Sequence, residues 1–224
     1  MLVSTIITNG QLLADVPNTN FFTEAEALFA VQASWKDIYS MLCDGGDDYF
    51  STPIYFTSSS FSTDSNRQDM YYFPINTIAV ITNNDFYRLR LLQYQGMNGN
   101  IYFSATRMTI ENFGNTQNTP AYRMVGQRIY VYDPSHYSNW CLWYYPAPAT
   151  LSTSTDLSYP YSMIPEIMAY QVAIEIRRKQ NLDFSQKEDR RNELIVSMNH
   201  QMNRDEAKAE SIKNVFTQGF APYI

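Results

Sequence analysis

The chain has 224 residues, and its 16 Lys and Arg against 22 Asp and Glu give a formal net charge of −6. Charged residues make up 17% of the chain, below the roughly 25% typical of soluble domains, whereas 18 Tyr, 13 Phe and 3 Trp bring the aromatic content to 15%. An apolar content of 45% excludes a disordered chain, and the acidic balance argues against a protein that grips nucleic acid by charge. No apolar run approaches the roughly 20 residues of a membrane helix.

The charges are distributed unevenly along the chain. Residues 1–163 hold 13 acidic and 7 basic residues, whereas residues 164–224 hold 9 of each. This predicts two differently built regions. Cys43 and Cys141 are the only cysteines and lie far apart, and the N-terminus lacks the basic and apolar segments of a secretory signal. We therefore expect a reduced protein made inside the cell.

Two helices are predicted before residue 49. Residues 3–14 have the apolar spacing of a short helix, although Gly10 weakens the pattern, and DVPNTN at 15–20 ends it. Thr23 and Glu26 form a capping box at the start of a second helix. Its apolar residues recur at helical spacing until Gly45 and Gly46 end it, so it has about 20 residues and one buried face.

Residues 49–150 predict a small antiparallel β domain. β-branched and aromatic segments alternate there with turn-forming residues. GMNGN and Gly126–Gln127 each predict a hairpin turn between two of these segments. The predicted strands are 49–57, 71–75, 86–95, 101–107, 121–125, 128–132 and 140–146, the last of which closes the sheet.

Helical periodicity returns after a linker at 151–163. A helix is predicted from Ile164, with acidic and basic residues at the ends that suit the helix dipole, and a longer helix over about 184–213. The latter is roughly 45 Å long and has only a thin apolar stripe, so part of it should contact another protein. The predicted fold is therefore α+β: a bundle of two N-terminal helices (1–48) and two C-terminal helices (164–213), an inserted small antiparallel β domain (49–150), and a C-terminal arm (214–224).

No group of residues predicts catalysis, a metal site or a cofactor. Asp133, Ser135 and His136 are close neighbours on a proline turn, which does not bring a nucleophile, base and acid together in space. Asp44, Asp47 and Asp48 lack the spacing of a calcium loop, and a solvated turn is favoured. We predict that the protein is not an enzyme.

Two further patterns have competing interpretations. The strand Trp140–Tyr145 places aromatic rings on both faces, which suits a sugar-stacking platform, but core on one face and subunit contact on the other is favoured. The basic residues from Arg177 to Arg191 alternate with acidic ones, which favours a salt-bridged helix surface over a DNA-binding one.

Four stretches carry a likeness to a known family. They are the helical pair that ends in TEAEALFAVQASWKDIYSML, the strands YYFPI and DFYRLRLLQY, the strands PAYRMVGQRIYVYDP and LWYYPAPATL with a proline-rich exit, and the helix IPEIMAYQVAIEIRRKQNLD before a long C-terminal helix. In this order they resemble the head-to-tail adaptor (connector or ring) proteins of short-tailed bacteriophages, over nearly the whole chain.

The resemblance implies a structural virion protein, made in the host cytoplasm and located at the head–tail junction. Such a protein forms a homo-oligomeric ring, usually of twelve subunits. It binds the portal protein, extends the DNA channel and provides a platform for tail or nozzle components. Genome DNA passes through the channel without specific binding, so we expect acidic surfaces from residues 1–163 to face the lumen.

We expect two sets of contact residues on this interpretation. The portal-binding set comes from the long helix and the arm: Met198, Met202, Phe216, Phe220, Tyr223 and Ile224. The subunit-interface set comes from the strands: Tyr130, Tyr132, Trp143 and Tyr145. The alternative function is a monomeric carbohydrate-binding or adhesin-like module that uses the Trp140–Tyr145 strand.

Overall fold

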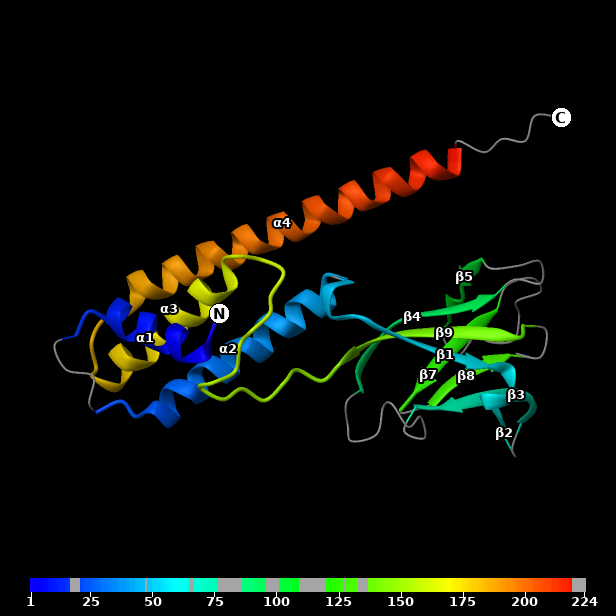
Figure 1. The fold of residues 1–224 in the computed structure, drawn as a ribbon, viewed down its shortest axis with the longest axis horizontal. Coiled ribbons are helices and arrows are strands. Elements are labelled where there is room, and N and C mark those ends of the chain that lie inside the picture. Colours follow the sequence, from blue (N-terminus) through cyan, green and yellow to red (C-terminus); the bar gives the residue numbers. More distant parts are fainter. Residues whose placement is uncertain are drawn as a thin grey trace. The chain divides into compact units, whose positions relative to one another are not determined.

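The computed structural model divides the chain into two compact units. It describes residues 1–16, 21–46, 48–64, 67–75, 86–95, 101–108, 120–126, 128–132 and 137–218, with only the backbone described at 67–69, 132 and 206–218. The helical unit comprises Met1–Tyr49 and Pro148–Ile224, and the β unit comprises Phe50–Ala147. Figure 1 shows the two units, which are described separately below.

The helical unit contains four α-helices. They are α1 (Val3–Ala14), α2 (Glu24–Asp44), α3 (Ile164–Lys179) and α4 (Ser185–Gln218). α3 is the central helix, because α1, α2 and α4 each pack against it. With 34 residues, α4 runs past the ends of the other three helices (Figure 1).

Gly10 allows α1 and α3 to approach each other closely. A Cβ atom at this position would lie 2.5 Å from Cβ of Val172 and 2.8 Å from the carbonyl oxygen of Ala169. Val3, Ile6 and Ile7 are buried on the same side of α1. The glycine that weakens the helical pattern in the sequence is thus a packing residue, and the predicted helix over 3–14 is confirmed.

The predicted capping box starts α2. Thr23 Oγ1 accepts a hydrogen bond of 3.3 Å from the Glu26 backbone N–H, and the Glu26 carboxylate accepts one of 2.8 Å from the Thr23 backbone N–H. The ammonium group of Lys179, at the end of α3, donates to the same carboxylate at 2.6 Å and to the carbonyl oxygen of Phe21 at 2.8 Å. The start of α2 is therefore tied to the end of α3.

Residues 148–163 run across the helical unit without regular secondary structure. Gln32 in α2 anchors this segment by accepting a hydrogen bond from the Leu151 backbone N–H at 2.6 Å and donating to the Ala149 carbonyl oxygen at 3.3 Å. Leu151 and Leu157 are buried. The N-terminal ammonium group donates to the Asp156 carboxylate at 2.8 Å, so the chain start and this segment are joined.

The β unit contains two sheets, which corrects the prediction of a helical bundle with one small antiparallel insert. Four strands have the order β1-β9-β4-β5, and five have the order β2-β3-β8-β7-β6. One neighbouring pair, β6 and β7, is parallel. The strands are β1 (Thr52–Thr57), β2 (Ser62–Asp64), β3 (Arg67–Pro74), β4 (Phe86–Gln95), β5 (Tyr102–Ser104), β6 (Thr106–Arg107), β7 (Ala121–Val125), β8 (Arg128–Tyr132) and β9 (Asn139–Pro146).

Two corners in the chain explain the second sheet. Between β1 and β2 the chain turns through a short 3-10 helix at Ser58–Ser60, and between β5 and β6 it turns at Ala105. At this second corner the Ala105 N–H donates to Leu92 of the four-stranded sheet, whereas the Thr106 N–H donates to Pro120 beside β7. Both edges of one sheet thus continue into edges of the other.

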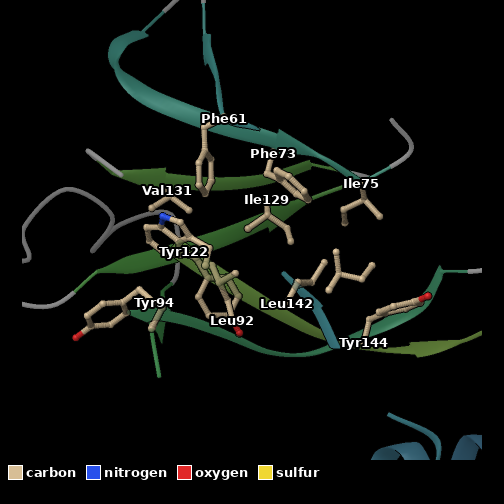
Figure 2. Packing of buried hydrophobic residues seen from close by; sticks show 13 residues of the cluster. Phe61, Phe73, Ile75, Leu92, Tyr94, Tyr122, Ile129, Val131, Leu142 and Tyr144 are labelled. Carbon is tan, nitrogen blue, oxygen red and sulfur yellow. The ribbon is translucent and has the colours of Figure 1, made fainter. Parts of the chain in front are cut away.

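The two sheets enclose one apolar core. Phe56 of β1 stacks on Phe73 of β3 at 4.0 Å between ring centroids, and Trp140 of β9 contacts Phe61 edge to face at 5.2 Å. Figure 2 shows side chains from both sheets pointing toward one another in this layer, with Leu92 and Leu142 facing Ile129 and Val131. The two predicted hairpins, β4–β5 and β7–β8, are confirmed, and β9 lies inside its sheet where a closing strand was expected.

Candidate interaction surfaces

The described portal-binding candidates on α4 lie inside the helical unit. Met198 and Met202 are both buried and form, with Leu194, the stripe by which α4 packs on its own unit. Phe216 belongs to α4, but its side chain lies outside the described part of the chain. Phe220, Tyr223 and Ile224 also lie outside the described residues. Met198 and Met202 therefore offer no surface to a partner.

The four subunit-interface candidates have different surroundings. Tyr145 is buried, with 1% of its surface exposed. Trp143 is half-buried, and its indole N–H donates to Gln93 Oε1 at 2.9 Å. Tyr130 is half-buried, and Tyr132 is described only in its backbone. Only Trp143 and Tyr130 of this set thus have a side chain with described, accessible surface.

A largely apolar groove lies between α2 and α3 on the helical unit. Phe29 lines it with 76% of its surface exposed, and the small residues Ala25 and Ala33 lie about one helical turn to each side. The groove has a volume of about 670 Å³. Phe29 lies off the buried stripe of α2, so helical periodicity does not predict the groove. Its one signal in the sequence is a large aromatic residue between alanines four positions away on each side.

Charged residues of both signs, from α3 and from the start of α2, also line this groove. Glu26 with Lys179 and Glu175 with Arg178 are ion pairs at 2.6 and 2.7 Å, and all four side chains line the groove. The hydrogen bond from Lys179, together with those from Thr23, lowers the pKa of Glu26 to about 2. Glu26 therefore stays ionised at neutral pH, and the groove has an apolar floor beside a charge-balanced rim.

A second surface lies on the face of the four-stranded sheet opposite the core. Tyr55 of β1 is 64% exposed, and its ring contacts Tyr102 of β5 edge to face at 6.0 Å between centroids. Side-chain amides share this face: Gln93 accepts a hydrogen bond from Trp143, and Asn139 donates to Gln95. Cys141 is buried on this face, and its burial raises the pKa of the thiol.

The Trp140–Tyr145 strand does not form the sugar-stacking platform considered from the sequence. Trp140 and Tyr144, which share one face of β9, are fully buried in the core between the sheets. On the other face Tyr145 is also buried, and the exposed ring is Tyr55 of β1, with half-buried rings from Tyr102 of β5 and Trp143 of β9. β1 and β5 are separated in the sheet by β9 and β4, so the proximity of Tyr55 and Tyr102 could not be predicted from the sequence.

Chemistry-bearing residues form no cluster within the described ranges. Three or more His, Cys, Asp or Glu residues nowhere converge there as they would around a metal ion. Asp133, Ser135 and His136, weighed above as a catalytic set, lie outside the described residues, as does Asp47. Among the described helices, none has the length and apolar content needed to span a membrane.

Comparison with known proteins adds no relative. No protein-family model matches the chain, and no curated protein matches it.

Proposed function

We propose that the chain is a structural virion protein, the subunit of a bacteriophage head-to-tail adaptor ring. In this role it binds the portal protein at the head–tail junction, extends the DNA channel and supports tail components. The order of segments in the sequence resembles that family, and the protein acts through protein–protein contacts.

The observation that best supports this proposal is the groove around Phe29. A phenylalanine that is 76% exposed contributes little to its own fold, and apolar side chains bordered by charged ones are typical of protein interfaces. A ring subunit needs two different lateral surfaces, since its contacts are heterologous. The groove supplies one surface with the shape and chemistry to receive an apolar helix.

The direct test is assembly with a portal protein. The purified chain, alone and mixed with candidate portal protein, is measured by native mass spectrometry and negative-stain electron microscopy. We expect closed rings on the portal, and we expect removal of residues 214–224 to abolish portal binding while the far-ultraviolet circular dichroism spectrum is unchanged. A chain that stays monomeric with every candidate portal contradicts the proposal.

Phe29→Ser tests the groove itself. Because Phe29 is exposed, the substitution should leave the free energy of unfolding nearly unchanged while weakening ring assembly at least tenfold. Leu12→Ser is the matched control, since Leu12 is 74% exposed on α1 of the same unit and does not line the groove. Equal assembly by both variants would show that the groove is not part of the ring interface.

The Tyr55 surface favours one alternative, a carbohydrate-binding module. Exposed aromatic rings among side-chain amides can stack on sugars and hydrogen-bond their hydroxyl groups. On this alternative a persistent monomer binds glycans on an array, and Tyr55→Ala removes the binding. A wild-type chain that binds no glycan and assembles on the portal excludes the alternative.

A further inference from the structure

Tyrosine and arginine side chains form a continuous row on the outer face of the five-stranded sheet. Tyr72 of β3 lies opposite Tyr130 of β8, which in turn lies opposite Arg123 of β7. Arg128 lies two residues before Tyr130 and therefore on the same face. The alternating residues Phe73, Ile129, Val131 and Tyr122 belong to the core. We call Tyr72, Arg123, Arg128 and Tyr130 the Arg/Tyr face.

The two arginines on this face have different surroundings. The guanidinium of Arg128 lies 4.6 Å from the centroid of the Tyr72 ring, and a hydrogen bond with Tyr130 raises its pKa, with a smaller effect from the charge of Asp64. Arg123 is half-buried, and the described residues provide it with neither a carboxylate nor a hydrogen-bond acceptor. A half-buried cation to which the described side chains supply no carboxylate is suited to a partner that supplies one.

The whole β unit shares this chemistry. Residues 50–147 contain six arginines, no lysine and five acidic residues, so the β unit has a net charge of +1. The remainder of the chain, which forms the helical unit, contains 17 acidic and 10 basic residues and has a net charge of −7. The net charge of −6 thus separates by unit into parts of opposite sign.

We propose that the Arg/Tyr face binds an acidic surface on the helical unit of a second copy of the chain. The inference rests on the proposed function, because it identifies one of the two lateral contacts of the ring. The charge complementarity is supplied by the chain itself, and the contact is heterologous, as ring closure requires. Arginine and tyrosine are enriched at protein interfaces and lysine is depleted, as in this unit.

A nucleic-acid ligand is the competing occupant. Aromatic rings with arginines also bind single strands by stacking and charge. However, affinity for a phosphate backbone grows with the number of cations that contact it, and the described side chains of this face include two. A net charge of −6 on the whole chain also opposes binding to a polyanion. The observations therefore favour the acidic protein surface.

The first test measures self-association by sedimentation velocity and native mass spectrometry, with and without portal protein. Arg123→Glu should weaken association at least tenfold, and Arg123→Lys should weaken it less because the charge remains without the planar fork. Arg107→Glu is the matched control, because it makes the same charge change at an exposed position on β6 of the same sheet. Arg107 is in register with the core residue Tyr122 and therefore does not belong to the Arg/Tyr face. Equal effects of Arg123→Glu and Arg107→Glu would overturn the proposal.

The second test identifies the occupant by photo-crosslinking. A photoreactive phenylalanine replaces Tyr72, and chains with natural isotopes are mixed with 15N-labelled chains so that links between copies are recognised by mass. We expect links from position 72 to peptides of 1–49 or 148–224 in another copy. The inference would be overturned if crosslinks formed only within one chain, only to portal protein or only to added DNA. It would also be overturned if no crosslink formed at a millimolar concentration of the chain.

The outcomes separate the inference from the proposed function. If wild-type and Arg123→Glu chains form equal rings on the portal, the inference fails and the adaptor function stands. If the links between copies form as expected but no portal supports a closed ring, the adaptor function fails while the contact remains.

Discussion

Replacing Gly10 by alanine should destabilise the helical unit, although alanine is the better helix former. In an isolated helix this change stabilises by about 1 kcal/mol. In the folded unit the new Cβ would meet Val172 at 2.5 Å and the Ala169 carbonyl oxygen at 2.8 Å. The sign of the measured effect therefore distinguishes local propensity from packing between α1 and α3.

The magnitude follows from which atoms are able to move. The Val172 Cβ and the Ala169 carbonyl oxygen are both fixed to α3, so no side-chain rotation relieves either contact. Ordinary contact requires about 3.4 Å or more, so α1 and α3 must separate by nearly 1 Å along their interface. Overpacking of this kind costs about 1–3 kcal/mol beyond any gain in propensity. For a chain of this size, each kcal/mol lowers the melting temperature by about 2–4 °C.

The assay is urea unfolding followed by circular dichroism at 222 nm, which reports the helices. Asn9→Ala is the control, since Asn9 is exposed on the same helix and should tolerate alanine. Adding Val172→Ala to Gly10→Ala removes the contact with Val172 Cγ1 at 2.7 Å but leaves the one with Cβ, so it should restore only part of the loss. A Gly10→Ala protein as stable as the wild type would refute the reasoning.

Three further predictions concern named contacts. Thr23→Ala should lower the free energy of unfolding by about 1 kcal/mol in the same assay, and Thr23→Ser should restore it, because the hydroxyl caps α2. The lowered pKa of Glu26 means that its stabilisation is present above about pH 4.5 and is lost as the pH falls toward 2, so Glu26→Gln should flatten the acid limb of a stability–pH curve. An unchanged limb would contradict the Lys179 contact. Leu92→Ala should cost about 2–5 kcal/mol and weaken the near-ultraviolet signal of the core, since Leu92 is fully buried between the sheets.

The helices could be predicted because their signals are local. The capping box, the glycines after Asp44 and the spacing of buried residues determine α2 within a stretch of about 25 residues. The hairpins are local in the same sense, since Gly126 adopts a positive φ of 57° in the turn between β7 and β8. The observed helices and hairpins agree with the predicted ones because each is stabilised by contacts between residues that are near in sequence.

The second sheet could not be predicted because its signals are non-local. Ala105 divides one apparent strand over 101–107 into two that pair with different sheets, and nothing in that stretch marks a break. The order in which β9 lies between β1 and β4 depends on pairing across more than 40 residues. The Arg/Tyr face has the same origin: Tyr130 was expected at an interface, but Tyr72 and Arg123 become its neighbours only when three strands align.

The division into units also changes which residues should face DNA in an adaptor. The acidic excess of residues 1–163 comes entirely from the part that belongs to the helical unit. Residues 1–49 and 148–163 contain eight acidic residues and one lysine, whereas residues 50–147 have a net charge of +1. A lumen that lets DNA slide should therefore be lined by the helical unit. Asp37 and Asp44 are exposed on α2, and lysine near the end of a helix suits its dipole.

Particles that carry Asp37→Lys and Asp44→Lys should then release DNA more slowly than wild type at low salt, and added salt should restore the rate because it screens the new charges. Particles with the same two changes that release DNA at the wild-type rate at low salt would place these residues away from the channel.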